Sequence, residues 1–353
     1  MKLALQIVTW NSSEYIADLF ASLRKSNLHE LDCELFILDN ASVDNTVEVL
    51  HKEVPAIGVP YKIIKEKQNT GFSGGHNRLF ALHNSEYLII INPDIIFEPD
   101  CIRGLVQFLD QHPEIAALAP RLMRSEQSTT VDSLGLQVFR NRRVVEIGAG
   151  QSWQSVNLSF RPERSEVEKS GSAIRYDKNA MEVFGLSGAC AMYRTEALRS
   201  VAFADGYFFD ETYGSYKEDV DLSFRLLSAG YRSCVLLNKV GYHRRSAKGL
   251  NDKSDEAAAK NKEKQSKMVK YNSYKNHLLT LYKNEYWQNL MIDFPLILWY
   301  ELKKFVYLLL FDQVVLKGLM EVWKKRKELL KKQAWIREKR KVSWKELRKW
   351  WKQ

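Results

Sequence analysis

Cysteine is scarce in this chain, and its four copies are widely scattered. Cys33, Cys101, Cys190 and Cys234 include no C-x-x-C pair, which argues against a zinc site or a disulfide framework. A reducing cytosol fits this pattern best. The chain is otherwise of ordinary globular composition, and its length leaves room for roughly two domains.

Long uncharged apolar runs are also missing. The apolar stretch Met1–Val8 is short and is followed by polar residues 11–14 without a small-residue cleavage site, so it predicts a first strand and not a signal peptide. Trp287–Phe311 is very apolar, but a spanning helix needs about 20 nearly uncharged residues. Four charged residues interrupt this stretch, namely Asp293, Glu301, Lys303 and Lys304. We therefore expect no helix that spans a bilayer.

Net positive charge is absent from most of the chain and is concentrated at its end. Residues 317–353 hold fifteen Lys and Arg against four Glu, a net charge of +11, whereas the whole chain carries +10. Residues 1–316 therefore carry a net charge of −1. The basic character belongs to the tail and not to the main domain.

The N-terminal part alternates between strand-like and helix-like patterns. Leu3–Thr9 is a β-type apolar run, and Ser13–Lys25 places its apolar residues on one helical face behind capping serines. The alternation continues with a strand at Glu34–Leu38, a helix starting in Asp44–Leu50, a strand at Tyr61–Ile64, a helix at Gly75–Asn84 and a strand at Tyr87–Ile91. This order predicts an α/β fold with a mostly parallel sheet covered by helices on both faces.

The remaining sequence has weaker patterns and no internal repeat. We expect a helix at Ile102–Gln111, a strand near Ala116–Ala119, irregular or hairpin structure over Arg121–Asn179, and a helix at Glu218–Ala229. Ser246–Lys270 is typical of a connector. Helical patterns follow at Tyr271–Tyr282, at Leu296–Leu310 and from Val322 to the end.

Polar clusters follow the strands of the predicted sheet. Thr9–Asn11, Asp39–Asn40, the loop 68–77 (QNTGFSGGHN) and Asn92–Asp94 all come where a strand ends. The carboxyl ends of parallel strands share one edge of a sheet, and ligands gather there. The glycine-rich loop fits neither the G-x-G-x-x-G nor the Walker pattern.

The candidate site combines carboxylates with one imidazole. Its residues are Asp39, Asp94, Glu218, Asp219, Asp221 and His243. Such a set suits a hard divalent cation, Mg²⁺ or Mn²⁺, which keeps open positions for phosphate oxygens. The pattern therefore predicts a substrate that carries a diphosphate.

The order of these motifs resembles glycosyltransferase family 2, in particular its bacterial rhamnosyltransferase-like branch. The resemblance spans residues 1–245 and is carried by IVTWN, LDNASVDNT, NTGFSGGHN, INPD, GLSGACAMYR, FFDETYGSYKEDVDLSFRLLSAGY and YHRRS. It implies a GT-A fold that binds a nucleoside-diphosphate sugar with a divalent metal and transfers the sugar with inversion. We expect this domain to be followed by a connector at 246–270 and by amphipathic, basic, membrane-associating helices at 271–353.

The resemblance assigns the nucleotide to the ends of the first two strands. Asp39 matches the family aspartate that hydrogen-bonds the pyrimidine base, with Thr9 and Asn11 beside it. The alternative for Asp39, and the preferred interpretation for Asp44, is a role in an Asx-turn or a helix cap.

The glycine-rich loop borders the nucleotide site in the family. The resemblance therefore implies nucleotide-sugar contacts for Asn69, Gly71 and Asn77. A tight strand-to-helix turn explains the same residues equally well.

The metal site is implied by the motif Asn-Pro-Asp. Asp94 matches the last position of the family D-x-D motif, while Asn92 departs from that pattern and offers the nucleotide-sugar only a neutral oxygen. A second metal ligand from elsewhere is therefore expected, and His243 matches the family histidine that supplies it. The alternative for His243 is an ordinary structural role.

The KEDVD segment matches the family's Glu-Asp motif on the acceptor side. Inverting transfer needs a general base for the acceptor hydroxyl, and we assign Asp219 first and Glu218 second, because only one of them can face the sugar at a helix start. The other would interact with the helix dipole, and Asp221 is expected to be structural. Three residues resemble the family's small-residue loop beside the acceptor, although packing would also explain them: Ser187, Gly188 and Ala189.

Tryptophan is concentrated in the basic tail. Five of the nine tryptophans lie there: Trp323, Trp335, Trp344, Trp350 and Trp351. Basic helices with interleaved Trp and Leu are typical of peripheral binding to anionic lipid. A nucleic acid partner and a merely solvated face are the alternatives for residues 317–353.

Together these observations predict a metal-dependent inverting glycosyltransferase of the bacterial cytosol, docked on the inner leaflet. It would add a sugar to a lipid-linked saccharide in surface-polysaccharide or cell-wall synthesis. The resemblance makes dTDP-L-rhamnose the first donor, with UDP-galactofuranose and UDP-N-acetylglucosamine as rivals. The alternative from another class is a catalytically inactive GT-A-like module that binds nucleotide-sugar or glycan and tethers partners to the membrane.

Overall fold

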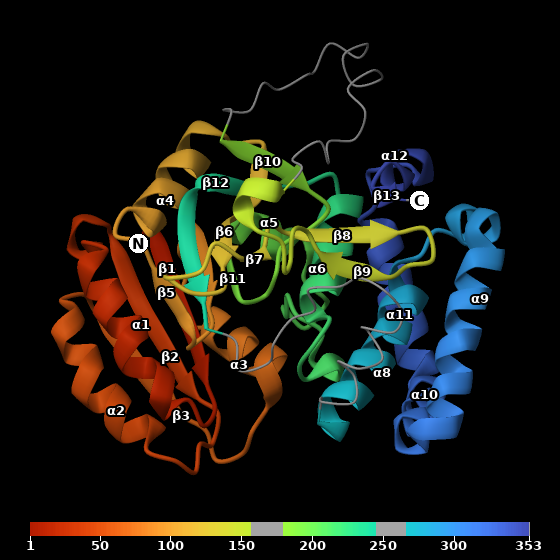
Figure 1. The fold of residues 1–353 in the computed structure, drawn as a ribbon, viewed down its shortest axis with the longest axis horizontal. Helices are drawn as coiled ribbons and strands as arrows, with labels where there is room; N and C mark the ends of the chain where they lie inside the picture. Colours follow the sequence, from red (N-terminus) through yellow and green to blue (C-terminus); the bar gives the residue numbers. More distant parts are fainter. Residues whose placement is uncertain (157–178, 245–265, 353) are drawn as a thin grey trace.

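The computed structural model describes residues 1–156, 179–244 and 266–352. Within these ranges the centre of the molecule is a ten-stranded sheet with the order β10-β12-β6-β11-β4-β1-β2-β3, to which β5 adds at β12 and β7 at β6. Helices cover both faces of this sheet (Figure 1). The predicted α/β class is confirmed.

The N-terminal half of the sheet is parallel. Its strands are β1 (Leu3–Thr9), β2 (Cys33–Asp39), β3 (Tyr61–Lys65) and β4 (Tyr87–Ile91), and they pair in the order β4-β1-β2-β3. The register sets Thr9 opposite Asp39. Because all four strands point the same way, their carboxyl ends form one edge.

The two faces of this half bury different residues of each strand, since strand side chains alternate. Leu3, Leu5 and Ile7 share a hydrophobic core with α1 (Ser13–Lys25), α2 (Thr46–Glu53) and α4 (Cys101–Gln111). Ala4 and the apolar residues of the opposite face pack with α3 (Gly71–Phe80), α5 (Thr195–Val201) and α6 (Glu218–Ser228).

The second half of the sheet is mixed. β11 (Cys190–Arg194) runs antiparallel to β4 and to β6 (Ile115–Met123), while β12 (Arg232–His243) pairs parallel with β6. β10 (Ala180–Val183) and β5 (Ile95–Phe97) pair antiparallel with β12, and β7 (Val131–Ser133) pairs antiparallel with β6. The pairing of β12 with β5 sets His243 opposite Ile95, just after β4 ends.

The C-terminal region packs on α6 and on a second, three-stranded sheet formed by β8, β9 and β13. Its helices are α8 (Lys267–Asn284), α9 (Trp287–Phe311), α10 (Lys317–Lys324), α11 (Arg326–Glu338) and α12 (Trp344–Arg348), with η6 (Gln313–Leu316) before α10. α8 contacts α6. The last strand, β13 (Trp351–Lys352), adds parallel to β8 (Leu136–Phe139), which pairs with β9 (Val144–Glu146).

A buried ion cluster fastens this region to the β8–β9 hairpin. Arg142, which follows β8 and is fully buried, donates to Glu285 and to Asp293 of α9. Arg348 of α12 donates to both carboxylate oxygens of Asp293 at 2.7 and 2.9 Å. The carboxyl group of Asp293 is therefore paired inside the protein and faces neither water nor lipid.

Four of the five tail tryptophans contact the protein. Trp335 donates its Nε1 to the carbonyl of Ala202 at 2.8 Å, and Trp344, Trp350 and Trp351 belong to a hydrophobic cluster with residues of β8 and α6. The expectation that residues 317–353 present all their tryptophans to a membrane is therefore wrong. The fifth, Trp323, is 65% exposed.

Several predicted boundaries shift. α3 begins at Gly71 and not at Gly75, because the loop before it is fixed by contacts with residues far away in the chain, described below. Part of Arg121–Asn179 forms β7, β8 and β9, as a hairpin prediction allows, and residues 157–178 lie outside the described ranges. Most of the predicted connector, residues 246–265, also lies outside them. No helix in the described part of the chain is long and apolar enough to cross a membrane.

Candidate active site

The ends of β1 and β2 meet at a buried carboxylate. Asp39 is fully buried and accepts hydrogen bonds from the Thr9 hydroxyl at 3.1 Å and from the Ser42 backbone N–H and hydroxyl at 3.1 and 2.5 Å. The bond to the Ser42 N–H reaches three residues along the chain, as in a helix cap, and not two as in an Asx-turn. Asp39 therefore fixes its own loop at the predicted nucleotide position, and this role does not exclude a contact with the nucleotide.

Asn11 joins the loops that follow these two strands. Its backbone N–H donates to the Ser42 hydroxyl at 2.9 Å, and its side-chain oxygen accepts from the Val43 N–H at 2.9 Å. Asn11 is exposed. Asp44 accepts from the backbone N–H of Thr46, two residues on, which is the Asx-turn contact, and from that of Ser13 at the start of α1. These contacts agree with the local structural role preferred for it.

The glycine-rich loop is held between Asn40 and a distant turn. Asn40 donates to the Gly71 carbonyl at 2.9 Å and accepts from the Thr70 N–H at 2.8 Å, while the Asn69 side chain accepts from the Gly71 N–H at 2.7 Å. Gly71 has a φ of +75°, and a Cβ there would lie 2.6 Å from the carbonyl oxygen of Gly214. Only glycine fits such a close approach.

Asn77 performs a different task from the one predicted for it. Its amide donates to the Phe209 carbonyl at 2.9 Å, and its oxygen accepts from the Phe209 N–H at 3.1 Å. It is 1% exposed. Asn77 therefore ties α3 to the chain before α6, and its contacts are structural.

The helix that carries the candidate base begins after a strained turn. Tyr216 and Lys217 have φ values of 75° and 70°, which bulky residues adopt at a cost and mostly at functional sites. α6 starts at the next residue, Glu218. The conformation of these two residues fixes the direction in which the first turn of α6 points its carboxylates.

The two carboxylates at the start of α6 have different surroundings. Asp219 is partly exposed and accepts from the backbone N–H of Gly188 at 3.0 Å and from that of Val220 at 2.8 Å. Glu218 is buried, and burial, reinforced by the nearby charge of Asp219, raises the pKa of its carboxyl well above the usual value. A raised pKa favours the neutral form, which cannot accept a proton. The partial exposure of Asp219 and the raised pKa of Glu218 therefore favour Asp219 as the base.

The small-residue loop lies against this carboxylate. Ser187 and Ala189 are each 5% exposed. A Cβ at Gly188 would lie 3.4 Å from the Cβ of Asp219, so the loop approaches the base closely. The carbonyl of Ala189 accepts from the Asn92 N–H at 2.9 Å, which joins the loop to the end of β4.

The predicted metal residues lie side by side. His243 Nε2 is 3.2 Å from Asp94 Oδ2, and His243 Nδ1 is 2.8 Å from Asp132 Oδ2. Burial lowers the pKa of the His243 imidazole, but the hydrogen bonds to Asp132 and Asp94 outweigh it and raise the pKa to about 9. Asp94 is the most exposed of the three, at 19% of its side chain.

This arrangement fits a divalent cation. Two ligands of one octahedral ion, each about 2.1 Å from it, lie about 3 Å apart, close to the 3.2 Å between His243 Nε2 and Asp94 Oδ2. Asp132 orients the imidazole through Nδ1, as carboxylates commonly do for metal-binding histidines. The described residues contain no group of three or more side chains arranged to hold a metal. Mg²⁺ is commonly bound by one or two carboxylates together with substrate phosphates, so Asp94 and a diphosphate would supply that set and His243 would add a nitrogen ligand.

α8 holds the strained turn in place. Asn276, fully buried on α8, donates its amide to the carbonyls of Tyr213, Ser215 and Tyr216 at 3.0, 3.0 and 2.7 Å. Asn276 touches none of the predicted site residues. It acts through the turn that sets the direction of Asp219.

Replacing Asn276 with leucine should lower kcat about 10- to 100-fold, because small displacements of a catalytic group are costly, and should change the KM for the donor less. The matched control is Asn289→Leu. Asn289 is equally buried and donates its amide to a carbonyl, that of Trp344, but it lies on α9. Steady-state kinetics should show a lower kcat for the Asn276 variant only. An equal loss of kcat in the two variants would show that Asn276 contributes to the stability of the fold and not to the position of Asp219.

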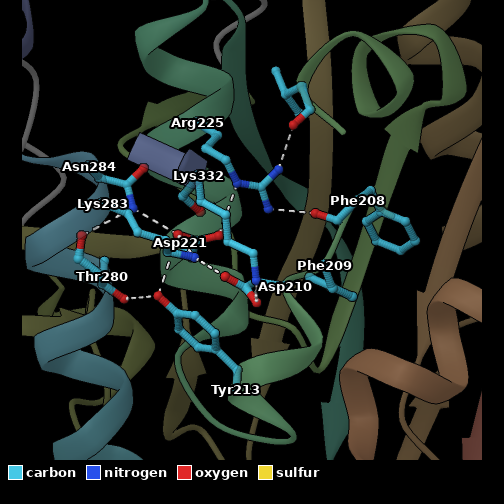
Figure 2. Close-up of polar contacts among 12 residues, drawn as sticks. Phe208, Phe209, Asp210, Tyr213, Asp221, Arg225, Thr280, Lys283, Asn284 and Lys332 are labelled. Atoms are coloured by element: carbon cyan, nitrogen blue, oxygen red, sulfur yellow. Dashed lines mark hydrogen bonds and ion pairs between the residues drawn. The ribbon is translucent and has the colours of Figure 1, made fainter. Parts of the chain in front are cut away.

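Charged side chains fasten α6 to the C-terminal helices (Figure 2). Lys283 of α8 pairs with Asp210 and, at 3.0 Å, with Asp221 of α6, and all three side chains are fully buried. Lys332 of α11 adds a bond to Asp210 at 2.7 Å, and Arg225 one to Asp221 at 2.9 Å. Asp221 is structural, as expected.

Sequence reasoning missed the residues that support the site. Asp132 lies in a stretch to which no role was assigned, Ser42 carries no pattern of its own, and Asn276 belongs to a helix predicted separately from the site. A polar residue in a loop after a strand is only a weak sequence signal for a residue that supports the site. No signal in the sequence connects Asn276 with the turn at Tyr216.

Contacts join almost all the predicted residues into one continuous site. One series of contacts runs from Asp39 through Asn40 to Gly71 and Gly214. A second runs from Asp219 through Gly188 and the Ala189 carbonyl to Asn92, which precedes the predicted metal residue Asp94. The turn containing Gly214 continues into α6 and closes the chain of contacts.

Comparisons with known proteins agree with this arrangement. The family profile described as "Glycosyl transferase family 2" matches residues 5–202. An N-acetylglucosaminyl-diphospho-decaprenol L-rhamnosyltransferase of Mycobacterium tuberculosis is 25% identical over 268 residues, which cover 72% of this chain and 80% of that protein. The poly(ribitol-phosphate) beta-N-acetylglucosaminyltransferase TarS of Staphylococcus aureus is 22% identical over 208 residues, 56% of this chain and 36% of TarS.

A solved structure supports the fold. The mannosyltransferase PcManGT from Pyrobaculum calidifontis, in complex with GDP-Man and Mn²⁺, matches with a TM-score of 0.52 at 12% identity, over 96% of this chain and 85% of that chain. At this identity the likeness concerns the fold alone. The fold is the GT-A fold that the sequence motifs imply.

Proposed function

Because the chain belongs to glycosyl transferase family 2, we propose that it transfers a sugar from a nucleoside-diphosphate donor to a hydroxyl group of a lipid-linked saccharide, with inversion. The observation that carries this proposal is the position of Asp219. Its carboxylate accepts a hydrogen bond from the Gly188 N–H, and the neighbouring Ala189 carbonyl accepts one from Asn92, two residues before Asp94. A base and a diphosphate site at one edge are what the reaction needs.

In the proposed mechanism Asp219 takes the proton of the acceptor hydroxyl as its oxygen attacks the anomeric carbon. The bond from that carbon to the diphosphate oxygen breaks on the opposite side, and the diphosphate leaves with the electron pair. Asp94 and His243 would hold a divalent cation, Mg²⁺ or Mn²⁺, which supplies positive charge against the leaving diphosphate. Asp39, with Thr9 and Asn11 beside it, would bind the base of the nucleotide, and Asn69 and Gly71 would border it.

We assign dTDP-L-rhamnose as the first donor. The support is the Mycobacterium tuberculosis relative, whose name specifies an L-rhamnosyl group and an N-acetylglucosaminyl-diphospho-decaprenol acceptor. That name also supports the lipid-linked acceptor. The inner face of the membrane and cell-wall synthesis are proposed on the family resemblance of the sequence motifs alone. The rivals are UDP-galactofuranose and UDP-N-acetylglucosamine; the TarS relative transfers N-acetylglucosamine.

A catalytically inactive module that binds nucleotide-sugar or glycan is the competing function. Such a module has no use for a base, yet Asp219 lies within one continuous set of contacts with the proposed donor and metal residues. The inactive module would bind donor and leave it intact.

A thermal shift screen tests donor binding and the metal together. The purified protein is heated with dTDP-, UDP- and GDP-sugars, each with Mg²⁺ or Mn²⁺ and each again with EDTA. A donor at 100 times its Kd should stabilise the protein by about 2.7 kcal/mol, and EDTA should remove most of that effect.

The variant Asp94→Ala should lose the metal-dependent part of the shift. Asp205→Ala is the matched control, since Asp205 is exposed and belongs to a turn before α6. Stabilisation by dTDP-sugars alone supports the first donor, and stabilisation by UDP-sugars alone supports the rivals. An unchanged melting temperature with every nucleotide would contradict the proposal.

A further inference from the structure

α9 carries an unusually large number of exposed apolar side chains. Trp299 is 62% exposed and Phe311 74% exposed. The other large apolar side chains of α9 exposed by more than a third are Trp287, Leu290, Met291, Ile292, Phe294, Leu296, Leu298, Leu302, Phe305, Val306, Leu309 and Leu310. The surface continues over Val314 of η6 and over Met320 and Trp323 of α10. We call the exposed apolar residues from Trp287 to Trp323 the α9 surface.

The amphipathic order of this helix is reversed. Its buried residues are Asn289, Asp293, Ile297 and Leu308, and the two polar ones bond to Trp344 and to the arginines around Asp293. A helix of a protein that is surrounded by water places apolar residues inward and polar residues outward. In α9 the N-terminal half does the opposite, so its outer side is suited to an apolar environment.

The width of the exposed face favours a broad, flat partner. At 3.6 residues a turn, the exposed apolar residues of α9 from Trp287 to Leu310 cover an arc of about 240°. A groove in another protein contacts a narrower stripe, like the seam of a coiled coil. α9 also lies along the outer edge of the molecule, on the side opposite α1 and α2 (Figure 1), where a flat surface can reach it.

The charges at this surface are of one sign. Within residues 287–323 the acidic side chains are Asp293, Glu301, Asp312 and Glu321. Each is bonded inside the protein, Glu301 to His277, Asp312 to Lys270 and Glu321 to Tyr271. The exposed charged residues from Trp287 to Lys327 are cations: Lys303, Lys317, Lys324, Arg326 and Lys327. Exposed cations beside exposed Trp, Phe and Leu complement an anionic lipid headgroup layer with acyl chains below it.

We propose that the α9 surface docks on an anionic lipid bilayer, with α9 lying in the plane of the headgroups. This surface narrows the predicted membrane contact, because of residues 317–353 only the start of α10 belongs to it, while most tail tryptophans pack against the protein. The helix is partly embedded and does not cross, because no described helix is long and apolar enough to span. The inference needs neither the donor nor the acceptor of the proposed reaction.

Vesicle flotation without substrates tests the docking. The full chain is mixed with vesicles of phosphatidylcholine alone or with added phosphatidylglycerol, and the bound fraction is measured. We expect binding to the anionic vesicles to exceed binding to the neutral ones at least tenfold. The double variant Trp299→Glu/Leu302→Glu should lower anionic binding at least tenfold, because it places two carboxylates on the apolar face.

Two controls make the result specific. Leu82→Glu makes the same kind of change at a residue exposed by 42% after α3, and it should leave binding unchanged. A second double variant, Leu310→Glu/Phe311→Glu, repeats the test at the other end of the helix in case the first does not fold. Retained folding is checked by circular dichroism melting.

Three results would overturn the inference. One is absence of binding by the wild-type chain to both vesicle types. Another is a wild-type protein that binds no vesicles and sediments as a dimer, while the Trp299→Glu/Leu302→Glu variant sediments as a monomer. That result would assign the α9 surface to contact with a second copy of the chain. The last is binding to DNA through the basic residues with none to vesicles. A protein that binds vesicles yet binds no nucleotide would leave the docking intact and contradict the proposed reaction alone.

Discussion

Replacing Asp219 with asparagine should lower the rate of sugar transfer by about 10²- to 10⁴-fold, the contribution that a general base typically makes. Asparagine has the shape of aspartate but cannot take the acceptor proton. The change should act on kcat and leave the Kd for the donor within about threefold, because Asp219 touches the Gly188 loop and not the proposed nucleotide residues. Initial rates of nucleoside-diphosphate release give kcat, and titration calorimetry gives the Kd.

Two further variants sharpen this test. Glu218→Gln should reduce the rate far less than Asp219→Asn, since burial already favours the neutral form of Glu218 and glutamine resembles a neutral carboxyl group. Asp205→Asn, at an exposed carboxylate outside the site, should have no effect. If Glu218→Gln abolishes transfer and Asp219→Asn does not, the base is Glu218. Full activity in both would contradict the enzymatic mechanism.

Replacing Lys283 with methionine should destabilise the folded protein by about 3–5 kcal/mol, the usual cost of removing one partner from a buried ion pair. Lys283 is the cation shared by Asp210 and Asp221, and all three side chains are fully buried. Methionine fills much of the same space, so the loss comes from charge and not from a cavity. Urea unfolding followed by circular dichroism measures the difference.

A surface pair provides the control. Lys62→Met removes the partner of Glu34 at 3.4 Å, and Lys62 is 55% exposed, so the expected cost is below about 1 kcal/mol. The double variant Lys283→Met/Asp210→Asn should recover part of the stability that Lys283→Met loses. Equal effects of Lys283→Met and Lys62→Met would show that the cluster in Figure 2 contributes little.

The same cluster predicts a dependence on pH. Burial by itself raises the pKa of the Asp210 and Asp221 carboxyls, but Lys283 and its neighbouring cations outweigh it and hold both below the usual value. A carboxyl whose pKa is lower in the folded state stabilises the fold above its unfolded pKa of about 3.9. That stabilisation is lost as the pH falls below about 4. The unfolding free energy of the Lys283→Met variant should therefore fall less steeply with acid than that of the wild-type protein.

The edge of the sheet could be predicted because it depends on local patterns. β1, α1 and β4 have the predicted bounds, and Asp39, Asn92 and Asp94 lie where their strands end. Parallel strands bring such residues to one edge whatever the details of the loops. The likeness to a family then assigned roles to His243 and Asp219, which lie far away in the sequence.

Contacts between distant segments could not be predicted. The early start of α3 depends on the approach of Gly71 to Gly214, and the orientation of His243 depends on Asp132. The tail gave the clearest error, because tryptophans among basic residues have the same pattern whether they face lipid or fill a cluster with Phe184 and Phe224. The apolar run Trp287–Phe311 contains charged residues whose partners its sequence does not identify. Arg142 and Arg348 bind Asp293 inside the protein, and these contacts decide which side of α9 faces outward.

The most direct test of sugar transfer is the mass of the product. The wild-type protein is incubated with Mg²⁺ or Mn²⁺, the donor selected by the thermal shift screen and an N-acetylglucosaminyl-diphospho-lipid, and the lipid is then analysed by mass spectrometry. We predict a gain of one sugar residue that disappears with EDTA and with Asp219→Asn. Recovery of the lipid unchanged, beside a donor that binds and stays intact, would contradict the account and identify a binding module.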